Sequence, residues 1–382
     1  MFRGVAAGKR NTVHDYLVVG AGLAGSTIAE RLASQLGARV LVIDKRSHVA
    51  GNTHDPLDPN GLRYHRYGPH IFHTNARHVV DYLSRFTRWL PYEHRVLARV
   101  GGKLVPIPIN RTTINRLYEL ELDAAGVESF LAARAQAQPR IENSEQMIVS
   151  RVGRELYETF FRGYTRKQWG LDPAELDATV CGRIPTRSDD DDRYFGDAFQ
   201  AMPAAGFTAL VENMLAHPNI EVVTDCDFQS VADRARFNHV IYTGPIDEYF
   251  DHKFGRLPYR SLSFEFETVA TAERGQQVGC VNEPDERVPF TRTTDYRHLT
   301  GQAGPTTILG REYPRAEGDP YYPIPRPDNR ELYRKYATLA AAQRHVTFVG
   351  RLAEYKYFNM DQAVASALVA FEELARTAAV AS

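Results

Sequence analysis

A glycine-rich turn near the start of the chain constrains its fold more than any other feature of the sequence. The apolar run Tyr16–Val19 leads into Gly20-Ala-Gly22-Leu-Ala-Gly25, and a second apolar run ends in Asp44, nineteen residues after Gly25. This order of strand, glycine turn, helix, strand and acid is typical of the βαβ unit that binds a dinucleotide. The alternative is a glycine-rich turn in an unrelated α/β domain.

Each position in this turn has a physical role. Gly20 permits the tight turn out of the strand, Gly22 lets a pyrophosphate approach the backbone, and Gly25 lets the helix pack closely on the strand. The helix predicted over 26–36 directs its free N–H groups and its positive dipole end at the phosphates. Asp44 is placed to accept hydrogen bonds from a ribose diol.

The residues after the acid favour FAD over a nicotinamide nucleotide. The segment from Lys45 to Asn52 holds a second small-residue turn at Gly51, which many flavoproteins place over the ribose and pyrophosphate. Asp44 alone does not separate FAD from NAD. Because the sequence contains no second fingerprint, we expect one bound dinucleotide and no additional domain for NAD(P)H.

Composition excludes several classes of protein. Among 382 residues, 43% are hydrophobic and 24% charged, and the net charge of −1 lacks the basic excess of a nucleic-acid-binding protein. No run reaches the roughly 18 apolar residues of a membrane span. The three cysteines have no disulfide or metal spacing, and the first residues lack a signal-peptide core. We therefore expect a cytoplasmic protein with no nucleic-acid partner and no membrane span.

The apolar segments divide the chain into one discontinuous domain with two inserts. The predicted fold class is α/β: a Rossmann-like FAD-binding domain with a helical insert and an antiparallel β-sheet insert. Helices are expected over 127–138 and 144–162, and a loop over 313–327. The expected parts are a flexible N-terminal tail at 1–14, the FAD-binding domain at 15–88, 202–248 and 340–382, the helical domain at 111–178, and the sheet domain at 89–110, 179–201 and 249–339.

A second constellation lies near the C-terminus. A predicted strand ends at Gly350-Arg351, and a helix is expected to start near Met360, with Asp361 in its first turn. The N-terminus of this helix is suited to stabilise negative charge on the pyrimidine end of a reduced isoalloxazine ring. The alternative is a capped helix that serves only packing, and the N-terminal fingerprint favours the flavin.

Arginines and aromatic residues recur together on the Pro- and Gly-rich segments of the middle and late chain. A tyrosine and a tryptophan lie between Gly163 and Gly170, while Arg183, Arg292 and Tyr322 each lie near a proline. A guanidinium group binds a diphosphate in a bidentate manner, and tyrosine or tryptophan stacks on a uracil or sugar face. Singly, each is as well explained as a surface arginine or half-buried tyrosine. Their recurrence favours an anionic ligand that carries a ring.

The histidines offer a third candidate, at positions 65, 70, 73 and 78. Their spacing lacks the His-Glu-x-x-His pattern and no cysteine lies near, so no metal site is predicted. Histidines that touch the flavin ring are favoured, with structural histidines as the alternative. The sequence shows no clear catalytic acid–base pair.

These stretches together resemble the UDP-galactopyranose mutase family of the bacterial type, over residues 15 to about 375. The landmarks in the middle of the chain are more specific than the glycine turn. They are Tyr67-Gly-Pro-His-Ile-Phe-His-Thr, Gly163-Tyr-Thr-Arg-Lys-Gln-Trp-Gly, Arg183-Ile-Pro, Tyr242-Thr-Gly-Pro-Ile-Asp, Tyr321-Tyr-Pro and Gly350-Arg-Leu-Ala-Glu-Tyr-Lys-Tyr.

The resemblance implies an FAD-dependent isomerase that is active with reduced flavin. It implies interconversion of UDP-galactopyranose and UDP-galactofuranose through a covalent adduct between sugar C1 and flavin N5, with no net redox change. The implied partners are UDP-galactose in both ring forms, UDP, an unidentified reductant and a second copy in a homodimer. In such chemistry, side chains need only position the diphosphate and shield the reacting atoms.

By matching positions, the resemblance implies catalytic roles for Arg183, Arg292 and His73, with both arginines clamping the diphosphate. Trp169 is expected on a mobile loop that closes over the substrate. The residues expected to bind substrate are His94, Tyr164, Thr165, Trp169, Arg183, Tyr194, Asn282, Arg292, Tyr322 and Tyr357. The residues expected to bind the cofactor are Gly20, Gly22, Ala24, Gly25, Asp44, Lys45, Gly51, Asn52, His70, Ile71, His73, Asp227, Phe228, Gly350, Arg351, Tyr357, Asn359, Met360 and Asp361.

Two residues depart from the family pattern. Ala50 stands where the family often has glycine and Asp44 where it can have glutamate, and both are tolerable for FAD. The acidic run from Asp189 to Asp192 has no explanation in the sequence, and two rival functions stay open. A flavin oxidoreductase of the amine-oxidase kind would share the fold, but its site is usually apolar. A GDP-dissociation inhibitor would share the fold without using flavin, and the intact glycine turn disfavours it.

Overall fold

The fold is built around a parallel sheet assembled from the start, middle and end of the chain. The computed structural model describes residues 13–232 and 234–381, so the expected tail at 1–14 lies almost wholly outside the described residues. The sheet has the order β15-β9-β1-β2-β8 with all neighbours parallel, which confirms the expected fold class. The strands are β1 Tyr16–Val19, β2 Val40–Ile43, β8 Ile220–Val223, β9 His239–Tyr242 and β15 Val346–Phe348.

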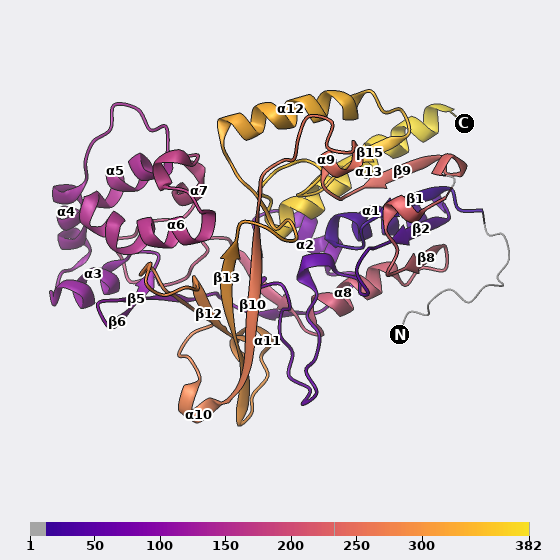
Figure 1. The fold of residues 1–382 in the computed structure, drawn as a ribbon. Helices are drawn as coiled ribbons and strands as arrows, with labels where there is room; N and C mark the ends of the chain where they lie inside the picture. The colour runs from indigo at the N-terminus through magenta and orange to yellow at the C-terminus, as the bar shows by residue number, and fades with distance from the viewer. Residues whose placement is uncertain (1–12, 233, 382) are drawn as a thin grey trace.

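Both faces of this sheet are covered, as its unbroken apolar strands require. Val18 of β1 belongs to a core shared with α1 (Leu23–Leu36), α8 (Gly206–Leu215) and α13 (Met360–Ala381). Its neighbour Leu17 belongs to a second core, with Phe237, on the opposite face. Figure 1 shows α1, α8 and α13 gathered around the parallel strands.

The helical insert forms a bundle on the other side of the molecule (Figure 1). The side chains of Asn110, Asp123 and Asn143 each accept a backbone N–H and cap the first three helices. The helices are α3 Arg111–Tyr118, α4 Ala124–Arg134, α5 Ser144–Tyr157, α6 Gly163–Trp169 and α7 Thr179–Gly182.

The single long helix expected over 144–162 is wrong in its interior. Gly153 has φ of 82°, and a Cβ there would lie 2.3 Å from the carbonyl oxygen of Arg134. The backbones of α4 and α5 therefore meet at a point that only glycine allows, and the helix is interrupted. Residues 158–162 then form a π-helical turn. The helix expected over 127–138 is α4, which begins and ends earlier.

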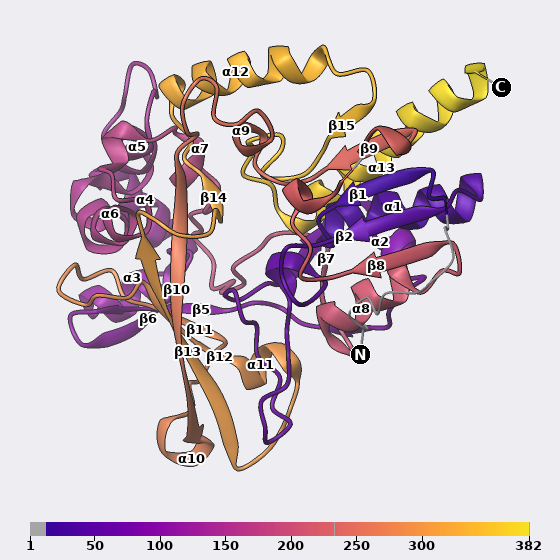
Figure 2. The ribbon, with the colours of Figure 1, turned by 45° about the vertical axis from the view of Figure 1, so that its right-hand side comes forward.

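A seven-stranded sheet joins the two bodies, in the order β14-β10-β13-β12-β11-β5-β6 (Figure 2). Its neighbours are antiparallel except β5 and β11. The hairpin expected around Gly101-Gly102 is confirmed. The loop expected over 313–327 is partly wrong, because β10 pairs with the end of β13 at the start of this segment and with β14 inside it. The strands are β5 Val96–Val100, β6 Lys103–Ile107, β10 Tyr259–Ala270, β11 Cys280–Asn282, β12 Arg292–Asp295, β13 Thr306–Arg315 and β14 Tyr322–Pro323.

Smaller elements connect these bodies. α12 (Pro327–Ala341) lies mostly in the segment expected to belong to the sheet domain, yet its Tyr336 packs with Ile246 and Tyr355 beside the parallel sheet. Among the described residues, no helix is both long and apolar enough to cross a membrane. The remaining elements are β3 Phe72–Thr74, β4 Trp89–Pro91 and β7 Phe199–Pro203, which form a three-stranded sheet, and α2 Arg77–Leu83, α9 Ile246–Tyr249, α10 Thr271–Arg274 and α11 Tyr296–Thr300.

Candidate active site

A cavity of about 480 Å³ lies at the carboxyl ends of β1, β2 and β9. This is the edge at which open parallel sheets bind ligands. Of the residues expected to bind the cofactor, Ile71, His73, Tyr357 and Asp361 lie outside the described lining. Those that line it are Gly20, Gly22, Ala24, Gly25, Asp44, Lys45, Gly51, Asn52, His70, Asp227, Phe228, Gly350, Arg351, Asn359 and Met360.

The two glycine turns form the wall of this cavity, backbone against backbone. A Cβ on Gly25 would lie 2.0 Å from the carbonyl oxygen of Gly20, and one on Gly51 would lie 3.1 Å from Cα of Gly22. Among the described residues, no side chain caps the N-terminus of α1. Its N–H groups are thus available to an anion, and the cradle fits the pyrophosphate of a dinucleotide.

Asp44 ties the glycine turn to the end of β2. One carboxylate oxygen accepts from Ala21 N at 2.8 Å, and the other accepts from Arg46 N at 2.9 Å. Each oxygen retains a second lone pair. Asp44 therefore remains able to accept a hydrogen bond from a ribose hydroxyl in the cavity that it lines.

His70 and Asp361 were both expected to lie at the flavin end of the cofactor, but only His70 lines the cavity. His70 lines the cavity, and burial lowers its pKa to about 3, so the ring is neutral. Its Nδ1 donates to the Gly68 carbonyl oxygen at 2.8 Å, which leaves Nε2 as an acceptor. Asp361 instead accepts from Thr74 Oγ1 at 2.7 Å because the first turn of α13 packs on β3.

Three arginines and three tyrosines form a second group, the arginine–tyrosine cluster (Arg183, Arg292, Arg351, Tyr164, Tyr322 and Tyr357). Cζ of Arg183 lies 4.6 Å from the centre of the Tyr357 ring, and Cζ of Arg292 lies 6.0 Å from that of Tyr164. Arg351 lies 5.5 Å from the Tyr322 ring and also lines the dinucleotide cavity. Arg351 therefore joins the cluster to the cavity.

Both outer arginines of the cluster keep their charge and have free donors. Desolvation by the surrounding protein opposes the charge of Arg183, but Tyr357 and Tyr194 raise its pKa above the ordinary value. Part of the residue remains exposed to solvent. Arg292 Nη2 lies 3.5 Å from Glu312 Oε1, and Glu312 is only 2% exposed. Neither this oxygen nor Arg292 Nε has a hydrogen-bond partner in the described part of the chain.

Two histidines near the cluster have fixed orientations. His73 Nδ1 lies 2.6 Å from Asp197 Oδ2, and its ring stacks on Phe195 with centroids 3.6 Å apart. His94 Nδ1 lies 3.0 Å from the Tyr92 hydroxyl, and burial lowers the pKa of His94 to about 3. Sequence reasoning missed Asp197, Phe195 and Tyr92, because only the fold brings them to these rings.

Trp169, which was expected on a mobile loop, lies in a helix, and its closure over the substrate stays a prediction. Trp169 is the last residue of α6, is 4% exposed, and lies 5.7 Å from Tyr357 between ring centroids. Thr165 is buried and faces Cys181 rather than the cluster. Asn282 pairs with Arg292 across β11 and β12, beside the cluster.

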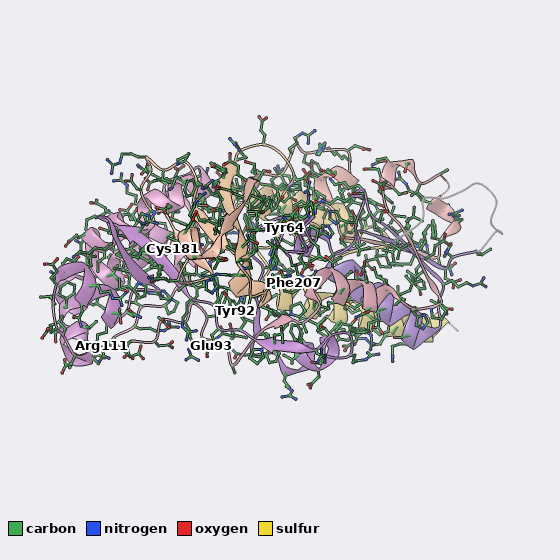
Figure 3. All side chains as sticks on the ribbon, turned by 90° about the horizontal axis from the view of Figure 1, so that it is seen from below. Tyr64, Tyr92, Glu93, Arg111, Cys181 and Phe207 are labelled. Carbon is green, nitrogen blue, oxygen red and sulfur yellow. The ribbon has the colours of Figure 1, made fainter. Side chains whose placement is uncertain are left out.

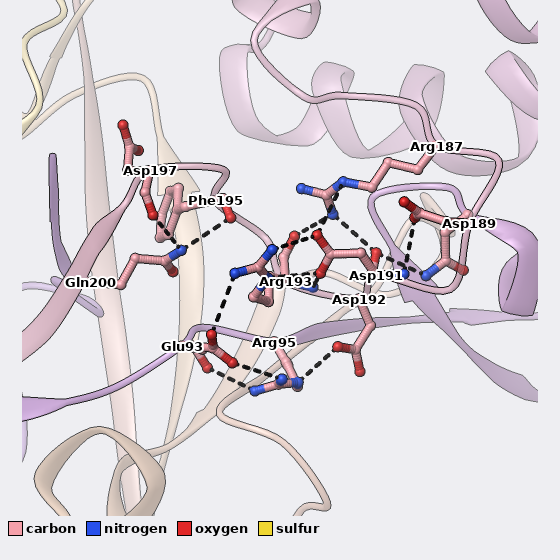
Figure 4. A network of polar contacts seen from close by, with 11 residues as sticks. Glu93, Arg95, Arg187, Asp189, Asp191, Asp192, Arg193, Phe195, Asp197 and Gln200 are labelled. Atoms are coloured by element: carbon pink, nitrogen blue, oxygen red, sulfur yellow. Dashed lines mark hydrogen bonds and ion pairs between the residues drawn. The ribbon is translucent and has the colours of Figure 1, made fainter. Parts of the chain in front are cut away.

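Arginines neutralise the acidic run that the sequence left unexplained (Figure 4). Asp190 binds Arg111 and Asp192 binds Arg95, both at 2.7 Å. Asp191 binds Arg193 at 2.9 Å. Seen from below, Glu93 in the same network lies between Arg111 on the helical insert and Phe207 on α8 (Figure 3). The run thus braces the segment that connects the helical insert to β7.

Comparison with known proteins identifies the family. The sequence model for UDP-galactopyranose mutase matches residues 159–357, and that for an NAD(P)-binding Rossmann-like domain matches residues 18–86. The solved structure titled "Crystal structure of reduced UDP-Galactopyranose mutase" superposes with a TM-score of 0.77 at 16% identity, covering 95% of this chain and 96% of that one. A putative protoporphyrinogen oxidase from Exiguobacterium sp. 255-15 gives 0.69 at 13% identity, covering 95% and 99%.

Relatives of known name align over nearly the whole chain. A probable UDP-galactopyranose mutase of Klebsiella pneumoniae is 37% identical, covering 94% of both chains. A dTDP-fucopyranose mutase of Escherichia coli is 36% identical, covering 92% of this chain and 96% of its own. A UDP-galactopyranose mutase of Mycoplasma pneumoniae is 32% identical, covering 94% and 96%. The chain therefore belongs to the UDP-galactopyranose mutase family, a family of enzymes.

Proposed function

We propose that the protein is a UDP-galactopyranose mutase that binds FAD and interconverts UDP-galactopyranose and UDP-galactofuranose. One observation carries the proposal: a cluster of three arginines adjoins a dinucleotide cavity through a shared residue, Arg351. A cofactor in the cavity and a diphosphate on the cluster would lie next to one another. The active site of an amine oxidase is usually apolar, so three clustered arginines disfavour that rival function.

The cavity supports FAD as the cofactor. The glycine cradle fits the pyrophosphate, Asp44 suits a ribose, and His70, Arg351 and Met360 line the remaining wall. When bound and reduced, flavin supplies a nucleophilic N5 for the anomeric carbon of the sugar, the chemistry that the family resemblance implies. The neutral, hydrogen-bonded ring of His70 offers an acceptor to that cofactor.

The chain's own residues bind and orient the nucleotide sugar. Arg183 and Arg292 hold the diphosphate by bidentate, charge-assisted hydrogen bonds, so that UDP stays in place after it leaves the sugar. Glu312 supports the charge of Arg292 without saturating its donors. The rings of Tyr322, Tyr357 and Trp169 pack together beside them and exclude water from the reacting atoms.

A second substrate is suggested by the relative named dTDP-fucopyranose mutase, which is nearly as similar as the mutase of Klebsiella pneumoniae. Both substrates are nucleoside diphosphates of a hexopyranose, so the arginines fit the part that they share. The two differ in the base and in the sugar. Turnover of both has to be measured for this reason.

The test is conversion of UDP-galactofuranose to the pyranose, with dithionite-reduced and oxidised protein side by side. Conversion only by the reduced sample would support the proposal. Conversion of the dTDP sugar alone would reassign the substrate, and oxygen consumption with amines but no isomerisation would favour the oxidase. A colourless protein from which no FAD can be extracted would overturn the cofactor. A homodimer, a cytoplasmic location and the need for a reductant stay predictions.

A further inference from the structure

An ammonium group lies at the centre of a backbone loop next to the arginine–tyrosine cluster. Lys167 of α6 donates from Nζ to four carbonyl oxygens of the β11–β12 loop (residues 283–291). The acceptors are Glu283 O at 2.5 Å, Asp285 O at 2.8 Å, Val288 O at 3.0 Å and Phe290 O at 2.9 Å. An ammonium has three protons, so four acceptors surround it as they would surround a spherical cation.

The loop and α6 carry different parts of the proposed substrate site. α6 contains Tyr164, and the β11–β12 loop begins after Asn282 and ends at Arg292. The Tyr164 ring and the Arg292 guanidinium face one another at 6.0 Å. Because Arg292 is the first residue of β12, the path of the loop determines where that guanidinium lies.

A contact outside the loop fixes α6. At its C-terminal end, Arg260 of β10 donates to the Gln168 carbonyl oxygen at 2.9 Å. At its start, the loop packs closely on the helix, because a Cβ on Gly163 would lie 2.4 Å from the Pro284 carbonyl oxygen. With α6 held by β10, the ammonium holds the loop against the helix.

We propose that Lys167 is a positioning residue whose ammonium serves as the central cation of the β11–β12 loop and so holds Arg292 against Tyr164. The four carbonyl oxygens of the loop resemble a binding site for a monovalent cation, and the ammonium group of Lys167 occupies the position of the ion. Burial lowers the pKa of Lys167 to about 8, although the nearby carboxylates of Glu283, Asp285 and Glu286 favour its charged form. The functional part of this inference rests on the proposed role of Arg292 in binding the diphosphate.

The test compares Lys167→Met, which keeps the stem without the charge, with Lys103→Met. Lys103 is exposed and donates to the Arg116 carbonyl oxygen and to Glu119, away from the cluster. Lys167→Met should retain FAD and raise the Kd for UDP by about tenfold or more, the loss of roughly one charge-assisted hydrogen bond. Lys103→Met should leave the Kd unchanged. Equal UDP affinity in Lys167→Met and the wild type would overturn the inference.

A cation-rescue experiment separates charge from packing. A cavity of about 430 Å³ lined by Pro284, Asp285 and Glu286 gives small ions access to the loop. In Lys167→Ala, ammonium or potassium chloride should restore part of the UDP affinity, and tetramethylammonium chloride at equal ionic strength should not. Equal effects of all three salts would overturn the role of the cation.

A measurement on the wild type covers the case in which the variants do not fold. Amide hydrogen exchange should show the N–H groups of Glu283, Val288 and Thr291, which donate to backbone carbonyl oxygens, as protected as those of α6, and rapid exchange at all three would overturn the inference. Failure of the wild type to bind UDP would instead count against the proposed function, and the exchange result would still stand.

Discussion

The close packing at Gly25 leads to a prediction about FAD binding. In Gly25→Ala, the new methyl group would lie 2.0 Å from the Gly20 carbonyl oxygen, so α1 must move away from β1. The N–H groups at its start would then leave the pyrophosphate. We expect the purified variant to lose most of its FAD, measured by visible absorbance after gel filtration.

Gly196→Ala is the matched control for that experiment. No described atom lies within 4 Å of a Cβ at Gly196, and its φ is not in the left-handed region. It should bind FAD as the wild type does. Full FAD content in Gly25→Ala would show that the close packing of helix and strand is not needed for the cofactor.

Substitution of Arg183 tests the proposed diphosphate-binding site, because Arg183 is not among the residues that line the cofactor cavity. Part of the residue is exposed, and its side chain contacts Tyr357 rather than the glycine cradle. Arg183→Ala should retain FAD, and its UDP affinity should fall by about ten- to a hundredfold, since a charge-assisted hydrogen bond contributes about 1.5–3 kcal/mol. Isothermal titration with UDP measures the change, with the exposed Arg140→Ala as the control. Equal titration curves for both variants would remove Arg183 from the site.

The interruption of helix α5 at Gly153 can be tested by comparing alanine substitutions at Gly153 and Gly101. Gly153 and Gly101 both have positive φ, 82° and 55°, so alanine costs backbone strain of about 1–2 kcal/mol at either position. Only at Gly153 would the methyl group also meet backbone, the Arg134 carbonyl oxygen at 2.3 Å. Urea unfolding should therefore show Gly153→Ala as the more destabilised variant. Equal losses in the free energy of unfolding for the two variants would mean that α4 moves away from α5 without destabilising the protein.

Elements whose cause is local could be predicted from the sequence. The strands and helix around Gly20, the hairpin at Gly101-Gly102 and the turn at Gly350 follow from apolar runs and glycines close to one another in the chain. The interruption at Gly153 could not, because it depends on a carbonyl group contributed by α4. Likewise, β14 is a strand only because β10 is long enough to pair with it.

The same distinction between local and long-range causes applies to the candidate site. The residues of the cavity were predicted from the fingerprint and from the family resemblance, and most of them line it. The contacts that orient the site could not be predicted, since Asp197, Glu312 and the four carbonyl groups around Lys167 come from distant segments. Residues that bind a ligand form a recognisable sequence motif. The contacts that hold those residues in place come from tertiary packing and have no such motif.

At the scale of the whole molecule, buried histidines make stability depend on pH. Burial lowers the pKa of His65, His70 and His94 to about 3, whereas each would titrate near its ordinary value in the unfolded chain. Between that value and about pH 3 the unfolded chain binds more protons, so the free energy of unfolding falls as the pH falls. Three such groups contribute about 4 kcal/mol per pH unit over this window.

We therefore expect the Tm to fall steeply between about pH 6.5 and pH 5, a range in which ordinary carboxylates remain largely ionised. Calorimetry in two buffers of different ionisation enthalpy, at equal FAD saturation, would count the protons taken up on unfolding. His65 is only 1% exposed, and His65→Asn should reduce that number by about one. A Tm that is constant over this range would mean that the buried histidines gain protons in the folded protein, and that the interior of the sheet and the cofactor cavity opens to water well before the chain unfolds.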